Sequence, residues 1–357
     1  MTRRWGRAVI AATLLAACGA PAPAPKTAAE TPKAAAPLHE GPLTDFVPAA
    51  GLRWMVVVRP AELSSAPSLK DALALLLPEP RLDAFAKSSG VELRELPAGV
   101  AAGFDYSTLY LFQLDNSGSA VQRQFSERLV GGPRVVSPHE KIRRITGVIG
   151  RTPESLVLID GELGAVSVGS ATPARVVELY ALGKLKKSPP ALSGAALSAL
   201  PKSVGSAPLA FYAPGPFEGE WARGARGLLI NAVAIGVSVR PLPGKKVEVT
   251  LVLAGDWPKP DATTRLVDAW DDLAASNLGR LLGLDHPAAA PIVSALPDQL
   301  KMTVELDVMP LAQGLRAAVL SEVWEIMDLP RPAPAGGGSP PKAPGEPKAP
   351  GLPEETP

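Results

Sequence analysis

Three closely spaced aspartates are the residues whose types and spacing could most readily do chemistry. They are Asp268, Asp271 and Asp272, and they fall in a segment, 263–282, whose apolar residues recur with helical spacing. On a helix Asp268 and Asp272 share a face, and Asp271 lies near Asp268. Such carboxylates could bind a cation or act as a general acid and base. The acidic face points away from the apolar stripe and Arg265 is close to it, so we interpret the cluster as a solvated surface.

Each of the three histidines stands next to a carboxylate, and one of them, His39, lies in the proline-rich N-terminal segment. A catalytic pair at Asp285 and His286 would need a nucleophile that the sequence does not supply; the pair could instead be solvated or interact with a helix C-terminus. His139 and Glu140 lack the second histidine of the pattern His-Glu-x-x-His, and we expect them in a loop. The nucleophile elbow, the phosphate loop and the complete Gly-x-Gly-x-x-Gly fingerprint are also absent. The sequence therefore predicts no catalytic residue, no metal site and no cofactor.

Tryptophan side chains could stack on a sugar ring, and five of the six lie beyond residue 18. Trp54, Trp270 and Trp324 stand within apolar patterns, which predicts that they belong to the core. Trp221 and Trp257 have polar or proline-rich neighbours. We therefore expect these two at the surface, where a sugar could reach them.

The overall composition narrows the class of protein. Lys and Arg together number 36 and Asp and Glu 35, a balance that excludes nucleic-acid binding driven by bulk charge. Hydrophobic residues make up 46% of the 357 residues, whereas the 40 prolines crowd toward the two ends. A single Cys excludes an intramolecular disulfide and a cysteine-built zinc site. We expect a folded body between two proline-rich segments, and no nucleic acid among its partners.

That single Cys stands at the end of an export signal. Three arginines within the first seven residues precede an apolar run over residues 8–17, which is shorter than the roughly 20 residues that a membrane-spanning helix needs. The run ends Leu15-Ala16-Ala17-Cys18, which resembles the lipobox of bacterial lipoproteins. In that family the Cys is diacylated on its thiol and the signal is cut before it. The resemblance implies that residues 1–17 are removed and that Cys18 is lipidated.

Lipidation would make the membrane a partner of this protein, because two or three acyl chains together hold a protein stably on a bilayer. Without residues 1–17 the chain carries 33 basic and 35 acidic residues. We therefore expect the lipid on Cys18, and not electrostatic attraction, to attach it. By the sorting rule of enterobacterial lipoproteins, Gly19 after the Cys implies the outer membrane, facing the periplasm; the cell surface is the alternative.

Proline-rich segments flank the body. Residues 18–50 combine prolines with alanines and scattered charges, which predicts an extended tether, and residues 330–357 predict a disordered tail. Pro-x-x-Pro sequences in these segments could instead bind a partner as polyproline ligands. The run from Gly183 to Pro190 combines a helix-stopping glycine, basic residues and two prolines. We divide the body there into two domains, 51–187 and 188–329.

Alternating and helical hydrophobic patterns predict the elements of the body. We expect strands at 54–58, 99–105, 108–114, 142–149, 156–159, 163–168, 208–213, 229–240, 245–254 and 302–308. We expect helices after a capping box at Ser68 and Asp71, after Ser119, from Thr172 to about Gly183, and over 263–282 and 311–327. Hairpins and one-sided strands predict an α+β fold: antiparallel sheets with helices packed on one face, in two similar halves. This layout weakly resembles duplicated α+β exported bacterial proteins of unknown function.

These observations favour a lipid-anchored cell-envelope protein with a non-catalytic body that binds or assembles with an envelope protein or the cell wall. One alternative is a carrier of lipids or other apolar ligands, which needs an apolar surface that the helices do not fill. Lys, Glu, Thr and Asp on the second face of the strands argue for water there. A second alternative is an envelope hydrolase whose site is built from residues distant in sequence.

Overall fold

The computed structural model describes residues 37–114, 118–185, 188–219, 222, 225–257 and 261–320. The predicted signal peptide, residues 18–36 of the predicted tether and the predicted tail lie outside these ranges. The strands are β1 (Leu52–Val58), β2 (Gly99–Phe104), β3 (Ser107–Gln113), β4 (Val130–His139), β5 (Ile142–Ile149), β6 (Thr152–Ile159), β7 (Leu163–Val168), β8 (Leu209–Pro214), β9 (Ala232–Leu242), β10 (Lys246–Gly255), β11 (Ile292–Leu296) and β12 (Gln299–Asp307). The α-helices are α1 (Pro60–Ser65), α2 (Lys70–Leu76), α3 (Glu79–Ser89), α4 (Ser119–Glu127), α5 (Thr172–Ala181), α6 (Leu200–Val204), α8 (Leu228–Asn231), α9 (Asp261–Ala275), α10 (Asn277–Leu281) and α11 (Val308–Leu320), and the 3-10 turns are η1 (Leu43–Phe46), η2 (Pro67–Leu69) and η3 (Ala191–Ser193).

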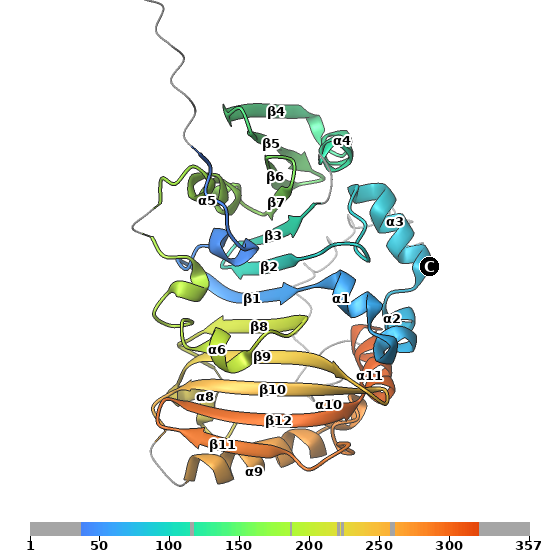
Figure 1. Ribbon diagram of the computed structural model, residues 1–357, viewed down its shortest axis with the longest axis vertical. Coiled ribbons are helices and arrows are strands. Elements are labelled where there is room, and N and C mark those ends of the chain that lie inside the picture. Colours follow the sequence, from blue (N-terminus) through green and yellow to red (C-terminus); the bar gives the residue numbers. More distant parts are fainter. Residues whose placement is uncertain are drawn as a thin grey trace, which may run out of the picture. The chain divides into compact units, whose positions relative to one another are not determined.

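The described strands form one sheet of twelve, in the order β11-β12-β10-β9-β8-β1-β2-β3-β7-β6-β5-β4. All neighbouring strands pair antiparallel. In Figure 1 the sheet runs from β4 at the top to β11 at the bottom. The expected α+β class with antiparallel strands is confirmed.

The two halves of this sheet share a common order of strands, to which the first half adds β4 and β5. β1, β2 and β3 are consecutive neighbours, α4 follows, and the last strand of the half, β7, returns beside β3. In the same way β8, β9 and β10 are consecutive neighbours, α9 and α10 follow, and β12 returns beside β10. The halves meet where β1 pairs with β8 and Met55 lies opposite Tyr212. The expected division near residue 188 thus falls between two halves of one sheet, and the described residues on both sides belong to one compact unit.

Helices cover both faces of the sheet, not one face as expected. On the first, which we call the α5 face, Met55 and Val157 pack in a core with η1, α5 and α6. On the second, the α9 face, Ile145 packs under α4, and Trp270 of α9 packs in the core over β10 and β12. The reason lies in strands such as β6, in which residues 155–159 are all buried, so that side chains on both sides of the strand need cover.

The folded body begins earlier than expected from the sequence. Residues 37–50, predicted to belong to the tether, pack against the α5 face, and Phe46 and Val47 are buried there. The backbone N–H of His39 donates to the carbonyl of Ala181 at the end of α5, at 2.8 Å. The tether prediction is wrong for this segment because its large apolar side chains complete the core.

Two helices also differ from their predicted extents. The helix expected over 263–282 is divided into α9 and α10, with Ser276 between them. The capping box at Ser68 does not form, because the 3-10 turn η2 leads into α2 without a side-chain cap. The carboxylate of Asp71 instead accepts a hydrogen bond of 2.8 Å from Lys245, in the turn between β9 and β10.

Candidate functional site

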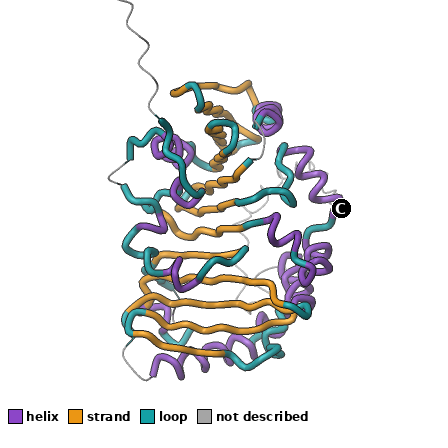
Figure 2. Tube along the Cα trace, viewed as in Figure 1, coloured by secondary structure: helices purple, strands orange, loops and turns teal. Residues whose placement is uncertain are grey.

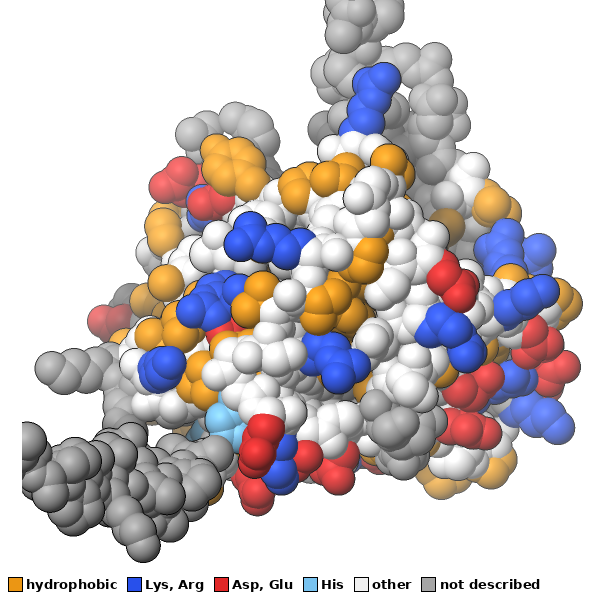
Figure 3. All heavy atoms as spheres, turned by 90° about the horizontal axis from the view of Figure 1, so that it is seen from above, with side chains coloured by type: hydrophobic (Ala, Val, Ile, Leu, Met, Phe, Trp, Pro, Cys, Tyr) orange, Lys and Arg blue, Asp and Glu red, His pale blue; other side chains and the backbone are white. Residues whose placement is uncertain are grey.

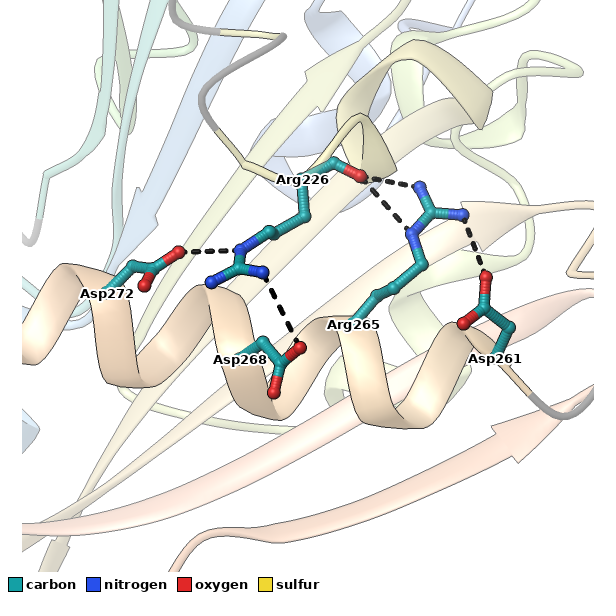
Figure 4. Close-up of polar contacts among 5 residues, drawn as sticks. All are labelled: Arg226, Asp261, Arg265, Asp268 and Asp272. Atoms are coloured by element: carbon teal, nitrogen blue, oxygen red, sulfur yellow. Dashed lines mark hydrogen bonds and ion pairs between the residues drawn. The ribbon is translucent and has the colours of Figure 1, made fainter.

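The aspartates of α9 meet an arginine. Figure 4 shows Arg226, in the turn before α8, reaching toward Asp268 and Asp272. The Nε of Arg226 lies 2.6 Å from the carboxylate of Asp272, and its guanidinium lies 3.6 Å from that of Asp268. Arg265 donates two hydrogen bonds, of 2.6 and 3.2 Å, to the backbone carbonyl of Arg226. These contacts join the turn before α8 to α9.

These contacts give the acidic cluster a structural role. The hydrogen bond between the two side chains raises the pKa of Arg226 and lowers the pKa of Asp272, so both groups stay charged. Asp272 and Asp268 both form ion pairs with Arg226, and its positive charge offsets part of the negative charge that would attract a metal ion. Within the described ranges no three His, Cys, Asp or Glu side chains are grouped as metal ligands would be. The ion pairs and hydrogen bonds of this surface therefore hold the turn before α8 against α9.

The two histidine–carboxylate pairs are not brought together. His286, exposed between α10 and β11, has its Nδ1 3.4 Å from the carboxylate of Asp285. His139 ends β4, and its Nδ1 accepts a hydrogen bond of 3.2 Å from the backbone N–H of Lys141. Glu140 lines a separate polar cavity of about 310 Å³. His139 thus belongs to a strand and not to the expected loop, whereas Glu140 follows the strand.

The prediction that Trp257 is exposed is wrong. The side chain is buried, and its indole N–H donates to the carbonyl of Leu253 at 3.0 Å, which satisfies the ring nitrogen inside the core. Trp270 is buried as predicted, and the half-buried Trp54 packs its ring over Gly103. The remaining two, Trp221 and Trp324, lie outside the described residues.

An apolar pocket lies where β1 leads into α1, and we call it the α1–α3 pocket. It has a volume of about 420 Å³, and eight of its twelve lining residues are apolar. They come from the end of β1, from α1, α2 and α3 and from the loop after α3, and include Val58, Leu63, Leu73, Leu77, Leu82 and Leu93. Figure 2 shows these helices gathered at one end of the strands. A pocket of this size and lining is typical of a site for a small apolar ligand.

Prolines start the helices that enclose the pocket. Pro60 is the first residue of α1, Pro67 starts η2 before α2, and Pro80 is in the first turn of α3. Proline is favoured there because its fixed φ suits a helix start and its missing N–H costs no helical bond. Leu73 of α2 and Leu77, the C-cap of that helix four residues later, lie on the same helical face and line the pocket. The pocket was not predictable from the sequence, because these leucines also fit an ordinary core stripe.

Polar contacts hold the pocket walls in place. The backbone N–H of Ala61 in α1 donates to the carbonyl of Leu96 at 3.1 Å, which joins α1 to the loop after α3. Arg94 in that loop lies 2.9 Å from Asp83, 3.1 Å from Glu92 and 3.8 Å from Glu79. Glu92 and Asp83 raise the pKa of Arg94, so the guanidinium stays charged. Two cations, Lys70 and Arg94, thus line the pocket, and three carboxylates, Glu79, Asp83 and Glu92, surround Arg94. The surplus of negative charge favours a neutral ligand over an anion.

The predicted lipidation site, Cys18, lies outside the described residues. Of the helices that the structure describes, none is both long enough and apolar enough to pass through a bilayer.

Comparisons with known proteins find only distant likeness. Neither a family model nor a curated protein matches the chain. Among solved structures, that of crystal form III of TP0453 is similar over 78% of this chain and 99% of that one, with 12% identity and a TM-score of 0.46. Crystal form IV of TP0453 is similar over 78% of this chain and 96% of that one, with 11% identity and a TM-score of 0.44.

Proposed function

We propose that this protein is a lipid-anchored cell-envelope protein whose body binds a neutral apolar ligand in the α1–α3 pocket. The observation that carries the ligand class is the aliphatic lining of a cavity of about 420 Å³. We assign binding and not catalysis to this pocket, because eight of its twelve lining residues are apolar and the Arg94 guanidinium is paired with carboxylates. Of the functions considered from the sequence, the carrier of apolar ligands fits this cavity best.

The anchor part of the proposal rests on the lipobox at Leu15 to Cys18. Intact-mass analysis of protein extracted from membranes should show residues 1–17 removed and acyl chains on Cys18. Cys18→Ser should leave an unprocessed precursor or release the body from the membrane fraction. An unmodified Cys18 thiol in membrane-extracted protein would contradict the anchor and leave the pocket proposal standing.

The ligand part is tested with two fluorescent probes of nearly the same ring system. We expect the neutral dye N-phenyl-1-naphthylamine to bind more tightly than the anionic anilinonaphthalene sulfonate, because three carboxylates surround Arg94. Two variants alter the pocket at exposed positions. Leu77→Gln makes the lining polar, and Ala74→Phe fills the cavity. Each should weaken binding of the neutral dye about tenfold or more, which corresponds to about 1.4 kcal/mol.

Phe85→Gln is the matched control for these variants. Phe85 is an exposed apolar residue of α3 that does not line the pocket, so its loss should leave dye binding unchanged. If the neutral dye does not bind, or if Leu77→Gln and Phe85→Gln weaken it equally, the pocket is not the binding site. Thermal melts of all variants show whether each is folded.

A further inference from the structure

The two edges of the sheet differ in how they are protected. β4, at one edge, contains Pro133 and Pro138, and Gly131 and Gly132 have positive φ. Its pairing with β5 is interrupted twice by register shifts. Seen from the β4 end, Lys and Arg side chains are scattered among apolar ones (Figure 3). Prolines, irregular pairing and charges are the devices by which proteins prevent an edge strand from pairing with another chain.

β11, at the other edge, has none of these devices. Its five residues, Ile292–Leu296, contain no charge and no proline, and all five pair with β12 without a register shift. Ile292 is 72% exposed and Leu296 58% exposed. A regular, uncharged and apolar edge strand presents unpaired backbone N–H and C=O groups as a template for a further strand.

We propose that β11 is a dimerisation edge, at which a second copy of this chain pairs antiparallel with β11 about Ser294. In this arrangement Ile292 of one copy lies opposite Leu296 of the other, Val293 lies opposite Ala295, and the two Ser294 residues face each other. The inference is independent of the proposed ligand, because the α1–α3 pocket is formed by other elements.

The prolines beside the strand select this register. Pro291 precedes β11 and Pro297 follows it, and proline has no N–H to give to a ladder. Pairing centred on Ser294 uses all five residues and leaves both prolines outside. In this register the numbers of the paired residues differ by an even number, as for 292 with 296 and 293 with 295. Backbone N–H and C=O groups point outward at every second residue of an edge strand, so the outward groups of one copy face those of the other.

Side chains on both faces suit the same pairing. Ile292, Ser294 and Leu296 lie on the α5 face, since they pair with Thr303, Lys301 and Gln299 of β12. Two Ile–Leu pairs would flank the serines there, and apolar cross-strand pairs stabilise antiparallel sheets. No like charges face each other within the strand pair. Five residues form a small interface, so we expect a dimer that depends on protein concentration.

The test uses the chain from residue 18 to 357 with Cys18→Ser, so that neither lipid nor a disulfide can join two copies. Analytical ultracentrifugation should show a monomer–dimer equilibrium. Ser294→Lys and Ser294→Glu each place two like charges opposite each other at an exposed position, and each should weaken dimerisation tenfold or more. An equimolar mixture of the two variants should dimerise again, because opposite charges then meet.

Val135→Lys is the control, because it adds a charge at the exposed β4 edge and should leave the dimer intact. Circular dichroism melts confirm that each variant is folded. A chain that stays monomeric at several hundred micromolar would overturn the proposal. So would a dimer that both Ser294 variants leave unchanged, or a mixture of the two that remains monomeric while each is folded.

Discussion

At the scale of single residues, Glu178 is a charged side chain that is fully buried. It lies in α5 and forms ion pairs with Arg144 of β5 and with Arg175, one turn earlier in the helix. Arg144 is largely buried, whereas the Arg175 side chain is 46% exposed. A buried ion that loses its partner keeps its desolvation penalty without compensation.

Glu178→Gln should therefore lower the free energy of unfolding by about 3 kcal/mol, because it leaves Arg144 facing a neutral amide in the core. Arg175→Ala is the matched control: it removes the more exposed partner, and we expect it to cost less than about 1 kcal/mol. Urea denaturation gives both values. Equal effects of the two variants would contradict the assignment of Arg144 as the main partner.

Glu154 in β6 predicts a pH dependence. Burial raises its pKa above the ordinary value of 4.5, and Arg128 opposes this effect in part. A carboxyl whose pKa is higher in the folded state favours folding when it is protonated, and this contribution is fully present below pH 4.5. The contribution is lost as the pH rises through the folded-state pKa. Glu154→Gln should raise Tm at about pH 7 and leave it unchanged at about pH 3.5. A Tm gain of the same size at both pH values would contradict this.

At the scale of elements, the division between α9 and α10 depends on one serine. Ser276 has extended backbone, and its hydroxyl accepts a hydrogen bond of 3.0 Å from the backbone N–H of Gly279. A side chain on Gly279 would collide with the carbonyl of Leu273, so the two helices approach closely at this corner. The cap lets the chain leave α9 and start α10 in a new direction.

Ser276→Ala should lower the free energy of unfolding by about 1 kcal/mol, the usual cost of removing an N-cap side chain. Ser276→Thr keeps a hydroxyl that can accept from Gly279 and donate to the carbonyl of Leu273, 2.6 Å from Ser276 Oγ, and should stay close to the wild type. Thermal melts compare the two. If Ser276→Thr destabilises as much as Ser276→Ala, the hydroxyl does not act as a cap.

At the scale of the whole molecule, long-range contacts unite segments that look separate in the sequence. The central pairing of β1 with β8 joins the two halves, and residues 37–50 pack beside η3 and α5. A backbone bridge between Pro48 and Pro190 joins this segment to the connection between the halves. The body should therefore unfold as one cooperative unit.

A fragment of residues 48–330 should be less stable than one of residues 37–330, because it lacks Leu43, Phe46 and Val47, which are all buried. Removing a buried Phe side chain alone costs about 3 kcal/mol or more. Denaturant melts of the two fragments measure the difference. Equal midpoints would show that residues 37–47 contribute nothing to the core.

The sequence by itself determined the local features of this protein. Alternation in segments such as 245–254 and the turn at Asp160 and Gly161, both with positive φ in the structure, are properties of neighbouring residues. They sufficed to predict most strands and the α+β class. The acidic cluster of α9 could also be recognised, but not its partner Arg226, which is 46 residues from Asp272 along the chain.

The tertiary structure alone decided which segments come together. Trp257 has polar neighbours in sequence, yet it is buried because it packs in the core with residues of α9 and β12. The α1–α3 pocket exists because three short helices enclose leucines that any core could have used. β11 is an edge strand because β12 is its one neighbour in the described sheet. Hydrophobic periodicity predicts which side of a helix or strand is apolar. Whether another element covers that side, and which one, depends on contacts between residues far apart in the chain.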